Sequence, residues 1–323
     1  MNGRGKLEIV APGDYPRQIQ GSPQTERLAP YGDVTLFTDV APTMEEQIER
    51  VRGAQVILNT RSSSRWPGDA LRQLPELRVI SVCAVGTDNI DLNVASELGI
   101  AVCNLPGWTA PVVAEHTIAL MFAAAKRAAF HTAELKAGRW KIEEAVYLKG
   151  KTLGVIGTGT IGGLVAETAR ALGMRVIAWT FNPSRQRAEE LGVEYVDLED
   201  LLRESDVVTL HPRLTDQTRG MLGRGEFKMM KPGAILVNCG RGQMVDTAAL
   251  VDALNSGHLG GAALDVFDPE PLPADHPLLA CRQVVLTPHM ADQTPEGLEL
   301  LNKGVVENVI AFLEGRPQNL VQP

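Results

Sequence analysis

Short hydrophobic runs bounded by turn residues alternate with amphipathic segments along almost the whole chain. This alternation is typical of parallel β-sheets whose two faces are covered by helices. In the first third of the chain it predicts strands at residues 7–10, 34–38, 56–59, 79–82 and 101–104. It also predicts a helix at residues 43–52, which begins with a capping box of Thr43 and Glu46. A second helix is predicted at residues 92–98 and ends at Gly99. The pattern therefore predicts the α/β class.

The alternation restarts after a stretch of proline and glycine at residues 104–108. The apolar segment at residues 112–129 predicts one continuous helix that is buried on most of its faces. Further strands are predicted at residues 152–156, 175–179, 193–196, 207–211, 234–238, 261–266 and 284–287. An amphipathic helix predicted at residues 296–313 is expected to pack on the first sheet. The sequence therefore predicts two doubly wound parallel-sheet domains.

Composition and charge narrow the class of protein. The chain has 323 residues, which suits two domains, and it is 44% hydrophobic and 22% charged, as folded soluble proteins are. The net charge is −8 and basic residues are interspersed with acidic ones, which argues against nucleic acid as a partner. No run approaches the roughly 20 apolar residues of a membrane span, and the first residues lack the pattern of a signal peptide. We therefore expect a cytoplasmic protein without a membrane partner.

The four cysteines are Cys83, Cys103, Cys239 and Cys281. Their positions show none of the spacings that zinc or redox sites have, so we interpret them as reduced thiols and expect no bound metal. A small anionic substrate remains compatible with the negative net charge, because a single arginine is enough to bind it.

A glycine loop follows a buried strand directly and has the sequence Gly157-Thr158-Gly159-Thr160-Ile161-Gly162. Residues 164–172 then have helical spacing, so the loop lies between a strand and a helix as in a dinucleotide fingerprint. Gly157 permits the tight turn, Gly159 lets a pyrophosphate approach the backbone, and Gly162 lets the helix pack closely on the strand. We therefore expect NAD or NADP to contact Gly157, Gly159, Thr160, Ile161 and Gly162.

The end of the next predicted strand carries Thr180, where an NAD-selective site has an acid for the ribose 2′-hydroxyl. Asn182, Ser184, Arg185 and Arg187 follow closely and are suited to surround a 2′-phosphate. This favours acceptance of NADP. The alternative is that the two arginines lie on the solvent face of the next helix, and the sequence leaves both interpretations open.

Three predicted strand ends of the second sheet carry polar residues with recognisable chemistry. Arg241 lies in a tight turn at the carboxyl end of a strand, where ligands bind in open α/β sheets, and its guanidinium suits a carboxylate. Glu270 lies between two prolines after the next strand, and His289 follows the last strand. We interpret Glu270 and His289 as an acid/base pair.

In these motifs the chain resembles the D-isomer-specific 2-hydroxyacid dehydrogenases, the family of phosphoglycerate, glycerate/hydroxypyruvate and D-lactate dehydrogenases. The resemblance covers almost the whole chain and includes residues 85–91 (VGTDNID), 104–107 (NLPG) and 113–117 (VAEHT). The chain departs from many relatives at residues 211–215 (HPRLT) and 290–293 (MADQ). Because both segments lie near the cofactor or the rim of the site, these departures leave the choice of substrate open.

The resemblance implies a fold, a reaction and an assembly. A Rossmann nucleotide-binding domain at residues 105–289 is expected to be inserted into a flavodoxin-like substrate domain formed by residues 1–104 and 290–323. The implied reaction transfers a hydride between NAD(P)(H) and C2 of a small 2-hydroxy or 2-keto acid of D configuration. Relatives of this kind are commonly homodimers, so a homodimer is expected.

The resemblance also implies roles for individual residues. The backbone of Val85 and Gly86 and the side chain of Arg241 would hold the substrate carboxylate, His289 would exchange the proton, and Glu270 would orient the imidazole. Expected cofactor contacts are Asp265 near the nicotinamide carboxamide, His211 and Thr218 near the adenosine, and Cys239. Arg61 falls in a loop that meets the far end of the substrate in relatives, where it either binds a second anionic group or is a surface arginine.

Elementary chemistry agrees with the proton-transfer pair. Reduction of a 2-keto acid leaves negative charge on the C2 oxygen, so a group that titrates near neutral pH must supply a proton. Histidine is such a group, and a carboxylate on its other ring nitrogen should raise its pKa.

Two other functions remain open on the sequence alone. The first is that of a nucleotide-sensing corepressor, a function that some proteins of this fold have. The second is that of a dehydrogenase whose substrate is an acid such as phosphonate or formate. His116, His131, His258 and His276 are expected to have structural roles only, and Trp140 is expected to pack inside the protein.

Overall fold

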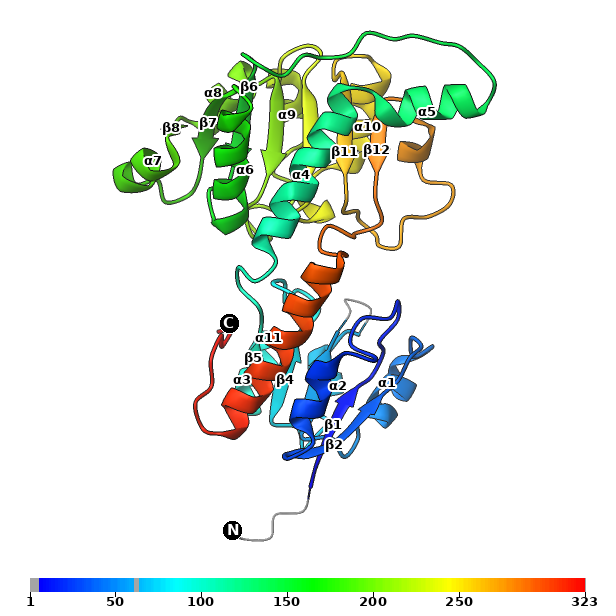
Figure 1. Cartoon of the computed structure of the whole chain (residues 1–323), viewed down its shortest axis with the longest axis vertical. Helices are drawn as coiled ribbons and strands as arrows, with labels where there is room; N and C mark the ends of the chain where they lie inside the picture. The colour runs from blue at the N-terminus through cyan, green and yellow to red at the C-terminus, as the bar shows by residue number, and fades with distance from the viewer. Residues whose placement is uncertain (1–5, 61–63, 323) are drawn as a thin grey trace. The chain divides into compact units, whose positions relative to one another are not determined.

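The computed structural model describes residues 6–60 and 64–322, and these residues form two compact units. The first unit contains Met1–Thr109 and Gln293–Pro323, and the second contains Ala110–Asp292. Figure 1 shows that each unit contains its own β-sheet with helices on its faces.

The first unit contains a five-stranded parallel sheet with the strand order β2-β1-β3-β4-β5, which is the flavodoxin-like order. Its strands are β1 (Leu7–Ala11), β2 (Gly32–Leu36), β3 (Val56–Asn59), β4 (Val79–Val82) and β5 (Ala101–Cys103). Successive residues of a strand point to opposite faces. Ile57 therefore packs with α1 (Met44–Arg50), α2 (Gly68–Leu71) and α3 (Leu92–Glu97), whereas Val56 packs with the 3-10 helix η1 (Pro23–Leu28) and with α11 (Pro295–Leu313).

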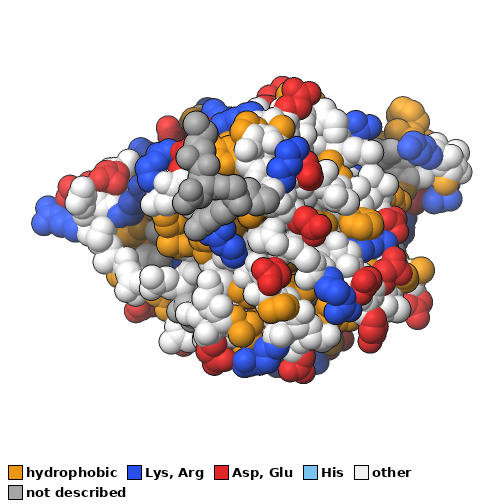
Figure 2. Space-filling model, turned by 90° about the horizontal axis from the view of Figure 1, so that it is seen from below, with side chains coloured by type: hydrophobic (Ala, Val, Ile, Leu, Met, Phe, Trp, Pro, Cys, Tyr) orange, Lys and Arg blue, Asp and Glu red, His pale blue; other side chains and the backbone are white. Residues whose placement is uncertain are grey.

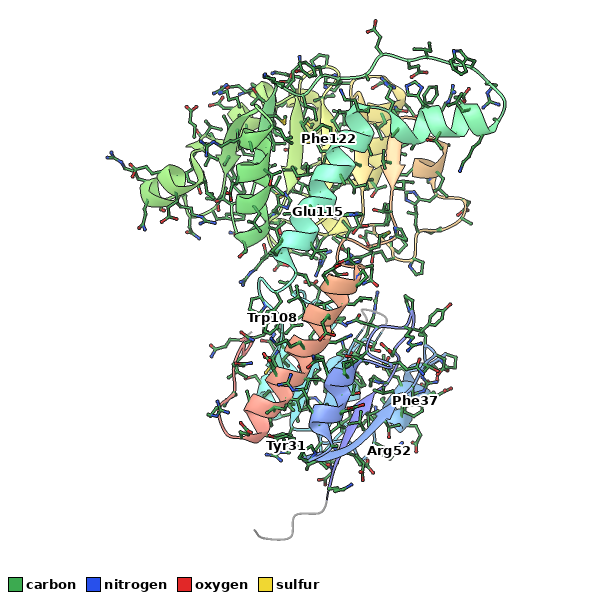
Figure 3. The ribbon with its side chains drawn as sticks, viewed as in Figure 1. Tyr31, Phe37, Arg52, Trp108, Glu115 and Phe122 are labelled. Atoms are coloured by element: carbon green, nitrogen blue, oxygen red, sulfur yellow. The ribbon has the colours of Figure 1, made fainter. Side chains whose placement is uncertain are left out.

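Helix α11 is fixed to the first unit along its length. Ser81 in β4 donates a hydrogen bond from its hydroxyl to the carbonyl oxygen of Val305 at 2.9 Å. Gly304 lies against Trp108, so closely that an added Cβ would be 3.1 Å from the indole ring. Just beyond the helix, the Tyr31 hydroxyl donates to Glu314 at 2.7 Å. Trp108 and Tyr31 are labelled beside this helix in Figure 3.

The second unit contains a seven-stranded parallel sheet with the order β12-β11-β10-β9-β6-β7-β8. Its strands are β6 (Thr152–Ile156), β7 (Arg175–Trp179), β8 (Glu194–Tyr195), β9 (Val207–Leu210), β10 (Ile235–Asn238), β11 (Gly261–Leu264) and β12 (Val284–Leu286). The order reverses between β6 and β9, as in the Rossmann fold, where the crevice at the strand ends binds a dinucleotide.

Helices cover both faces of this sheet. On one face α4 (Ala110–Ala125) and α6 (Thr160–Ala171) lie side by side in Figure 1 and pack on residues such as Val155 and Val237. On the other face α8 (Leu198–Glu204), α9 (Arg224–Met229) and α10 (Thr247–Asn255) pack on residues such as Val208 and Leu236. The prediction of two doubly wound parallel-sheet domains is confirmed.

The prediction of one continuous helix at residues 112–129 is wrong. Helix α4 ends at Ala125, and a separate helix, α5, spans Ala128–Lys136. Between them Arg127 adopts a left-handed conformation with φ 51°. Its guanidinium pairs with Glu143 at 3.0 Å and donates to the carbonyl oxygen of Glu144 at 2.9 Å, so contacts with a distant segment stabilise the break.

Several predicted strands are longer than the observed ones, and the difference matters for the site at β9 and β11. Strand β9 ends at Leu210 and β11 ends at Leu264, so His211 and Asp265 lie just beyond the sheet. Polar side chains at these positions do not have to alternate with the core residues of a strand.

The surface carries charges of both signs. Figure 2 shows acidic and basic side chains interspersed over the face that it views. Within the described residues no helix has the length and apolarity that a membrane span requires. The four cysteines are free thiols, and all of them are buried. Trp140 is 86% exposed, so the prediction that it packs inside this chain is wrong.

Candidate functional site

The glycine loop joins β6 to α6, and each of its three glycines meets a different steric requirement. Gly157 has φ +90°, and a Cβ there would be 2.7 Å from the backbone nitrogen of Pro212. A Cβ at Gly162 would collide with the carbonyl oxygen of Gly157. At Gly159, by contrast, a Cβ would meet no atom within 4 Å. The first and third glycines therefore shape the loop, and the second leaves space above it for a ligand.

This space lies at the N-terminus of α6, where backbone N–H groups of a helix favour an anion. Gly159 is the N-cap residue, and no side chain caps this end of the helix. Thr160 and Ile161 form the first helical positions. The residues present therefore fit the pyrophosphate of a dinucleotide.

Among the residues after β7, Arg185 was expected to lie near a bound 2′-phosphate, but its side chain faces solvent. The Arg185 side chain is 93% exposed and pairs with Glu189 at 2.9 Å, and Asn182 is also exposed. Ser184 caps α7 (Arg185–Leu191) by accepting a hydrogen bond from the N–H of Arg187. Arg187 is the arginine that reaches the glycine loop, with Nη2 3.5 Å from the carbonyl oxygen of Thr158. Thr180 is half-buried at the end of β7.

His211 directly follows β9, and Thr218 lies seven residues further along the chain. Burial lowers the pKa of His211 to about 4, so the imidazole is neutral at pH 7, and its Nε2 is 2.9 Å from the Thr209 hydroxyl. The buried Thr218 hydroxyl donates to the carbonyl oxygen of Arg213 at 2.7 Å and accepts from the N–H of Thr215 at 2.8 Å. Both side chains thus have contacts that fix the loop beside the glycine turn.

The turn that carries Arg241 is held by a residue that the sequence analysis did not select. The side chain of Asn238, the last residue of β10, donates to the carbonyl oxygen of Arg241 and accepts from the N–H of Gly240, both at 2.9 Å. A Cβ at Gly242 would collide with the backbone of Phe267, so only glycine lets this turn approach the loop after β11. A buried amide at the end of an otherwise apolar strand was the signal that could have identified Asn238.

The Cys239 thiol is not suited to act as a nucleophile, because a nucleophilic cysteine must be a thiolate. It is buried, and burial raises the pKa of its thiol to about 12, with the nearby Asp265 charge acting in the same direction. It packs with the apolar residues between α4 and the sheet.

Glu270 and His289 are in direct contact, as the sequence analysis predicted. His289 Nδ1 is 2.8 Å from Glu270 Oε2, and the other carboxylate oxygen accepts the N–H of Phe267 at 2.9 Å. Burial works to lower the pKa of His289, but the hydrogen bond and the charge of Glu270 outweigh it, so the pKa is raised. Burial works to raise the pKa of Glu270, and the contact with His289 brings it below its ordinary value. The contact thus favours the charged forms of both groups, the imidazolium and the carboxylate.

Arg241 acts electrostatically on both members of this pair. Its charge helps to lower the pKa of Glu270 and opposes the rise in the pKa of His289. Its own Nη1 donates to the carbonyl oxygen of Gly240 at 2.8 Å. The strand ends of β10, β11 and β12 are neighbours in the sheet, so the three predicted residues are brought together at one edge.

Asp265 is fully buried and organises the segment that carries His289. Its carboxylate accepts the Thr287 hydroxyl at 2.5 Å and the N–H groups of Met290 at 2.9 Å and Ala291 at 3.0 Å. Its backbone carbonyl accepts the N–H of His289 at 2.7 Å. These contacts show what the carboxylate does within the chain, while its expected place near the nicotinamide stays a prediction.

His116 contacts this group, and the sequence assigned it a structural role only. It lies in α4, where Figure 3 labels the preceding residue, Glu115. Its Nε2 is 3.2 Å from the Thr287 hydroxyl and 3.5 Å from the Asp265 carboxylate. The signal for it was its position in residues 113–117, a segment that the sequence analysis used only for the resemblance.

The expected substrate residues Val85 and Gly86 lie in the turn after β4 of the first unit. Asn104 holds this turn by donating its side-chain N–H to the carbonyl oxygen of Val85 at 2.6 Å, and the side chain of Val85 is exposed. Arg61 lies outside the described residues. In the part of the chain that is described, no cluster of His, Cys, Asp and Glu side chains is arranged to hold a metal ion.

Known proteins are similar to this chain over most of its length. The model of the NAD-binding domain of D-isomer specific 2-hydroxyacid dehydrogenases matches residues 118–291. A glyoxylate reductase from Aeropyrum pernix is 44% identical over 307 residues, which cover 92% of this chain and 91% of the relative.

Solved structures are similar over the whole chain. A D-lactate dehydrogenase from Aquifex aeolicus, complexed with NAD and lactic acid, has a TM-score of 0.85 at 29% identity, with 98% of this chain and 99% of that chain covered. An acyclic imino acid reductase in complex with NADPH and D-Arg has a TM-score of 0.87 at 28% identity, with 98% and 100% covered.

Proposed function

The chain belongs to the D-isomer-specific 2-hydroxyacid dehydrogenase family, and from this membership we propose that it reduces a small 2-keto acid to the D-2-hydroxy acid, with His289 as the proton donor. It is an NAD(P)-dependent 2-hydroxyacid dehydrogenase by family. The observation that carries the residue assignment is the 2.8 Å contact between His289 Nδ1 and Glu270 Oε2.

This contact supports a role for one particular ring nitrogen in the proposed proton transfer. Because Glu270 accepts the hydrogen of Nδ1, the nitrogen left to exchange a proton with the substrate is Nε2. The bound nicotinamide would supply or accept the hydride at C2. As charge develops on the C2 oxygen during reduction, Nε2 gives up its proton and the imidazolium becomes a neutral imidazole, which solvent then protonates again. In the oxidation direction the neutral imidazole takes the proton of the hydroxyl.

Within the second unit, Arg241 would bind the substrate carboxylate. A guanidinium forms paired hydrogen bonds with a carboxylate and therefore fixes its orientation. The hydrogen bonds that the Asn238 side chain donates to Arg241 and accepts from Gly240 keep this group at the strand end. Orientation of the bound acid is what makes hydride addition at C2 productive.

The substrate is proposed to be glyoxylate or an acid of similar size, since the Aeropyrum pernix relative is named a glyoxylate reductase. The test is the oxidation of NADH and NADPH with glyoxylate, hydroxypyruvate, pyruvate, phosphohydroxypyruvate and bulkier keto acids. Reduction of the small acids and a loss of about 10²-fold or more in kcat for His289→Ala would support the proposal. If neither cofactor is oxidised with any of these keto acids, the result would favour a nucleotide-sensing binding protein instead.

We also propose that the protein accepts NADP and that Arg187 is the arginine that contacts its 2′-phosphate. Thr180 does not carry the negative charge that would repel this phosphate, and Arg187 reaches the glycine loop whereas Arg185 pairs with Glu189 in solvent. Arg187→Gln should weaken binding of 2′,5′-ADP by about tenfold, the loss expected for about 1.4 kcal/mol. Arg185→Gln is the matched control and should bind it as the wild type does. Equal binding of 2′,5′-ADP and 5′-AMP by the wild type, with a large kcat/KM advantage for NADH, would exclude the proposal.

A homodimer is proposed from the exposed segment that follows α5. Trp140 is 86% exposed and Ile142 is 81% exposed, which is unusual for side chains of this size. The segment is nevertheless anchored, because Arg139 pairs with Glu134 at 2.7 Å and Glu143 pairs with Arg127. Trp140→Ser should shift the mass measured by light scattering from dimer toward monomer, while a similar change at the exposed Phe181 should not. A monomeric wild type would contradict this proposal.

A further inference from the structure

His116 lies where helix α4 meets the loops after β11 and β12. Its side chain is 18% exposed. Nε2 faces two oxygen atoms, Thr287 Oγ1 at 3.2 Å and Asp265 Oδ1 at 3.5 Å. The ring therefore contacts the same two side chains that organise the segment carrying His289.

The hydrogen bonds among these groups determine where the proton on the imidazole lies. Thr287 has a single hydroxyl hydrogen, and it donates this hydrogen to Asp265 Oδ1 at 2.5 Å. Toward His116 the hydroxyl oxygen must therefore accept. The Asp265 carboxylate is also an acceptor, because burial, which works to raise its pKa, is outweighed by hydrogen bonds from His116, Met290 and Thr287. Nε2 of His116 consequently carries a hydrogen, whether the ring is neutral or charged.

The segment that this network holds needs restraint. His289 has φ 50°, a left-handed conformation that residues other than glycine rarely adopt and that is strained. Thr287, two residues before His289, and Met290, one residue after it, are both bound by the Asp265 carboxylate. Asp265 thus fixes both sides of the strained residue, and His116 in turn fixes Asp265 and Thr287 from the helix.

We propose that His116 is a positioning residue for proton transfer: its Nε2–H holds Thr287 and Asp265 so that the segment after β12 keeps His289 in contact with Glu270. The inference rests on the proposed function of His289. His116 does not contact the reacting atoms in this role, and it acts through the two side chains that it binds.

The charged and titratable groups around His116 agree with this role. From the end of β11, Asp265 faces it as a carboxylate, and from the end of β10, Cys239 lies close to Asp265 as a neutral thiol because burial raises its pKa. His289 and Glu270 lie beyond Asp265, and the Asp265 charge acts to raise the pKa of His289. Loss of the His116 hydrogen bond would therefore disturb the geometry of the segment that carries His289.

The test compares His116→Leu, which removes the donor, with His116→Gln, which places an amide N–H near the position of Nε2. The first readout is the titration of the His289 ring by NMR with 15N-labelled histidine, assigned with His289→Ala. The second is the pH profile of kcat/KM for keto acid reduction. His116→Leu should lose about tenfold in kcat and move the titration of His289 to lower pH, because its contact with Glu270 loosens. His116→Gln should stay within about threefold of the wild type in kcat, since the hydrogen bond is kept.

Two further variants control for folding and for chemistry. His131→Leu makes the same change in the neighbouring helix α5, where the ring packs on Phe130, and should leave both readouts unchanged. Thr287→Val keeps His116 and removes the hydroxyl between it and Asp265, so it should reproduce the shift even where His116→Leu does not fold. An unshifted His289 titration in either folded variant overturns the inference. If His289→Ala itself keeps normal turnover, the proposed function fails, which is a separate outcome.

Discussion

Glu270→Gln removes the negative charge that faces His289 and preserves the size of the side chain. The two groups are 2.8 Å apart, and the His289 side chain is 42% exposed. The dielectric constant of water gives the smallest attraction that such a pair can have, and Coulomb's law then yields about 1.5 kcal/mol. Since one pKa unit corresponds to about 1.4 kcal/mol, the substitution should lower the pKa of His289 by about one unit.

The assay is the pH dependence of kcat/KM in both directions of the reaction. Reduction needs the protonated imidazole, so its alkaline limb should move to lower pH by about one unit, and well below that limb the rate should change little. Oxidation needs the neutral imidazole, so its acid limb should move to lower pH by the same amount. Asp268→Asn is the matched control, because it removes a charge from the same loop, and Asp268 is not among the groups that shift the pKa of His289. Limbs that stay in place in Glu270→Gln would refute the assignment of the pair.

Three further predictions address the stability of the pair, the glycine loop and the Arg241 turn. The pKa of His289 is raised in the folded chain and that of Glu270 is lowered, so their contribution to stability should be full between their ordinary values of 6.5 and 4.5. It should be lost as pH rises through the folded pKa of His289 or falls through that of Glu270, and urea unfolding of the wild type and Glu270→Gln at pH 5.5 and pH 9 checks this. Gly162→Ala should lower the free energy of unfolding by about 1–3 kcal/mol because of its collision with Gly157, whereas Gly159→Ala should unfold like the wild type and bind NAD(P)H at least about tenfold more weakly. A Gly159→Ala protein with normal cofactor affinity would contradict the placement of the pyrophosphate. Asn238→Ala should raise the KM for the keto acid more than it lowers kcat, as expected for loss of substrate orientation by Arg241, and an unchanged KM would show that the turn holds without it.

The sheets and their strand ends could be predicted because they depend on local periodicity. A parallel strand buried on both faces is a short continuous apolar run, and the polar residue that ends such a run marks the carboxyl edge of the sheet. Arg241, Glu270 and His289 were all selected on this basis, and the structure places them in the loops that follow the neighbouring strands β10, β11 and β12. The contact between Glu270 and His289 followed from this placement.

What could not be predicted depends on contacts between distant segments. Nothing near residues 112–129 predicts the break at Arg127, because the left-handed conformation is stabilised by Glu143 and Glu144. The choice between Arg185 and Arg187 depended in the same way on the direction of α7 relative to the glycine loop. Local pattern determines which segments form strands and helices, whereas side-chain partners depend on the assembled fold.

Asp265 is a buried carboxylate close to the proposed proton donor, His289. Its position explains why it does not compete with Glu270 for the imidazole of His289. Both of its oxygens accept hydrogen bonds from the segment 287–291, so its charge is satisfied by donors that do not move protons in the reaction. Glu270 has one oxygen fixed by the N–H of Phe267 and offers the other to the imidazole. The two carboxylates therefore act on different parts of His289. Asp265 holds its backbone in the strained conformation, and Glu270 raises the pKa of its imidazole.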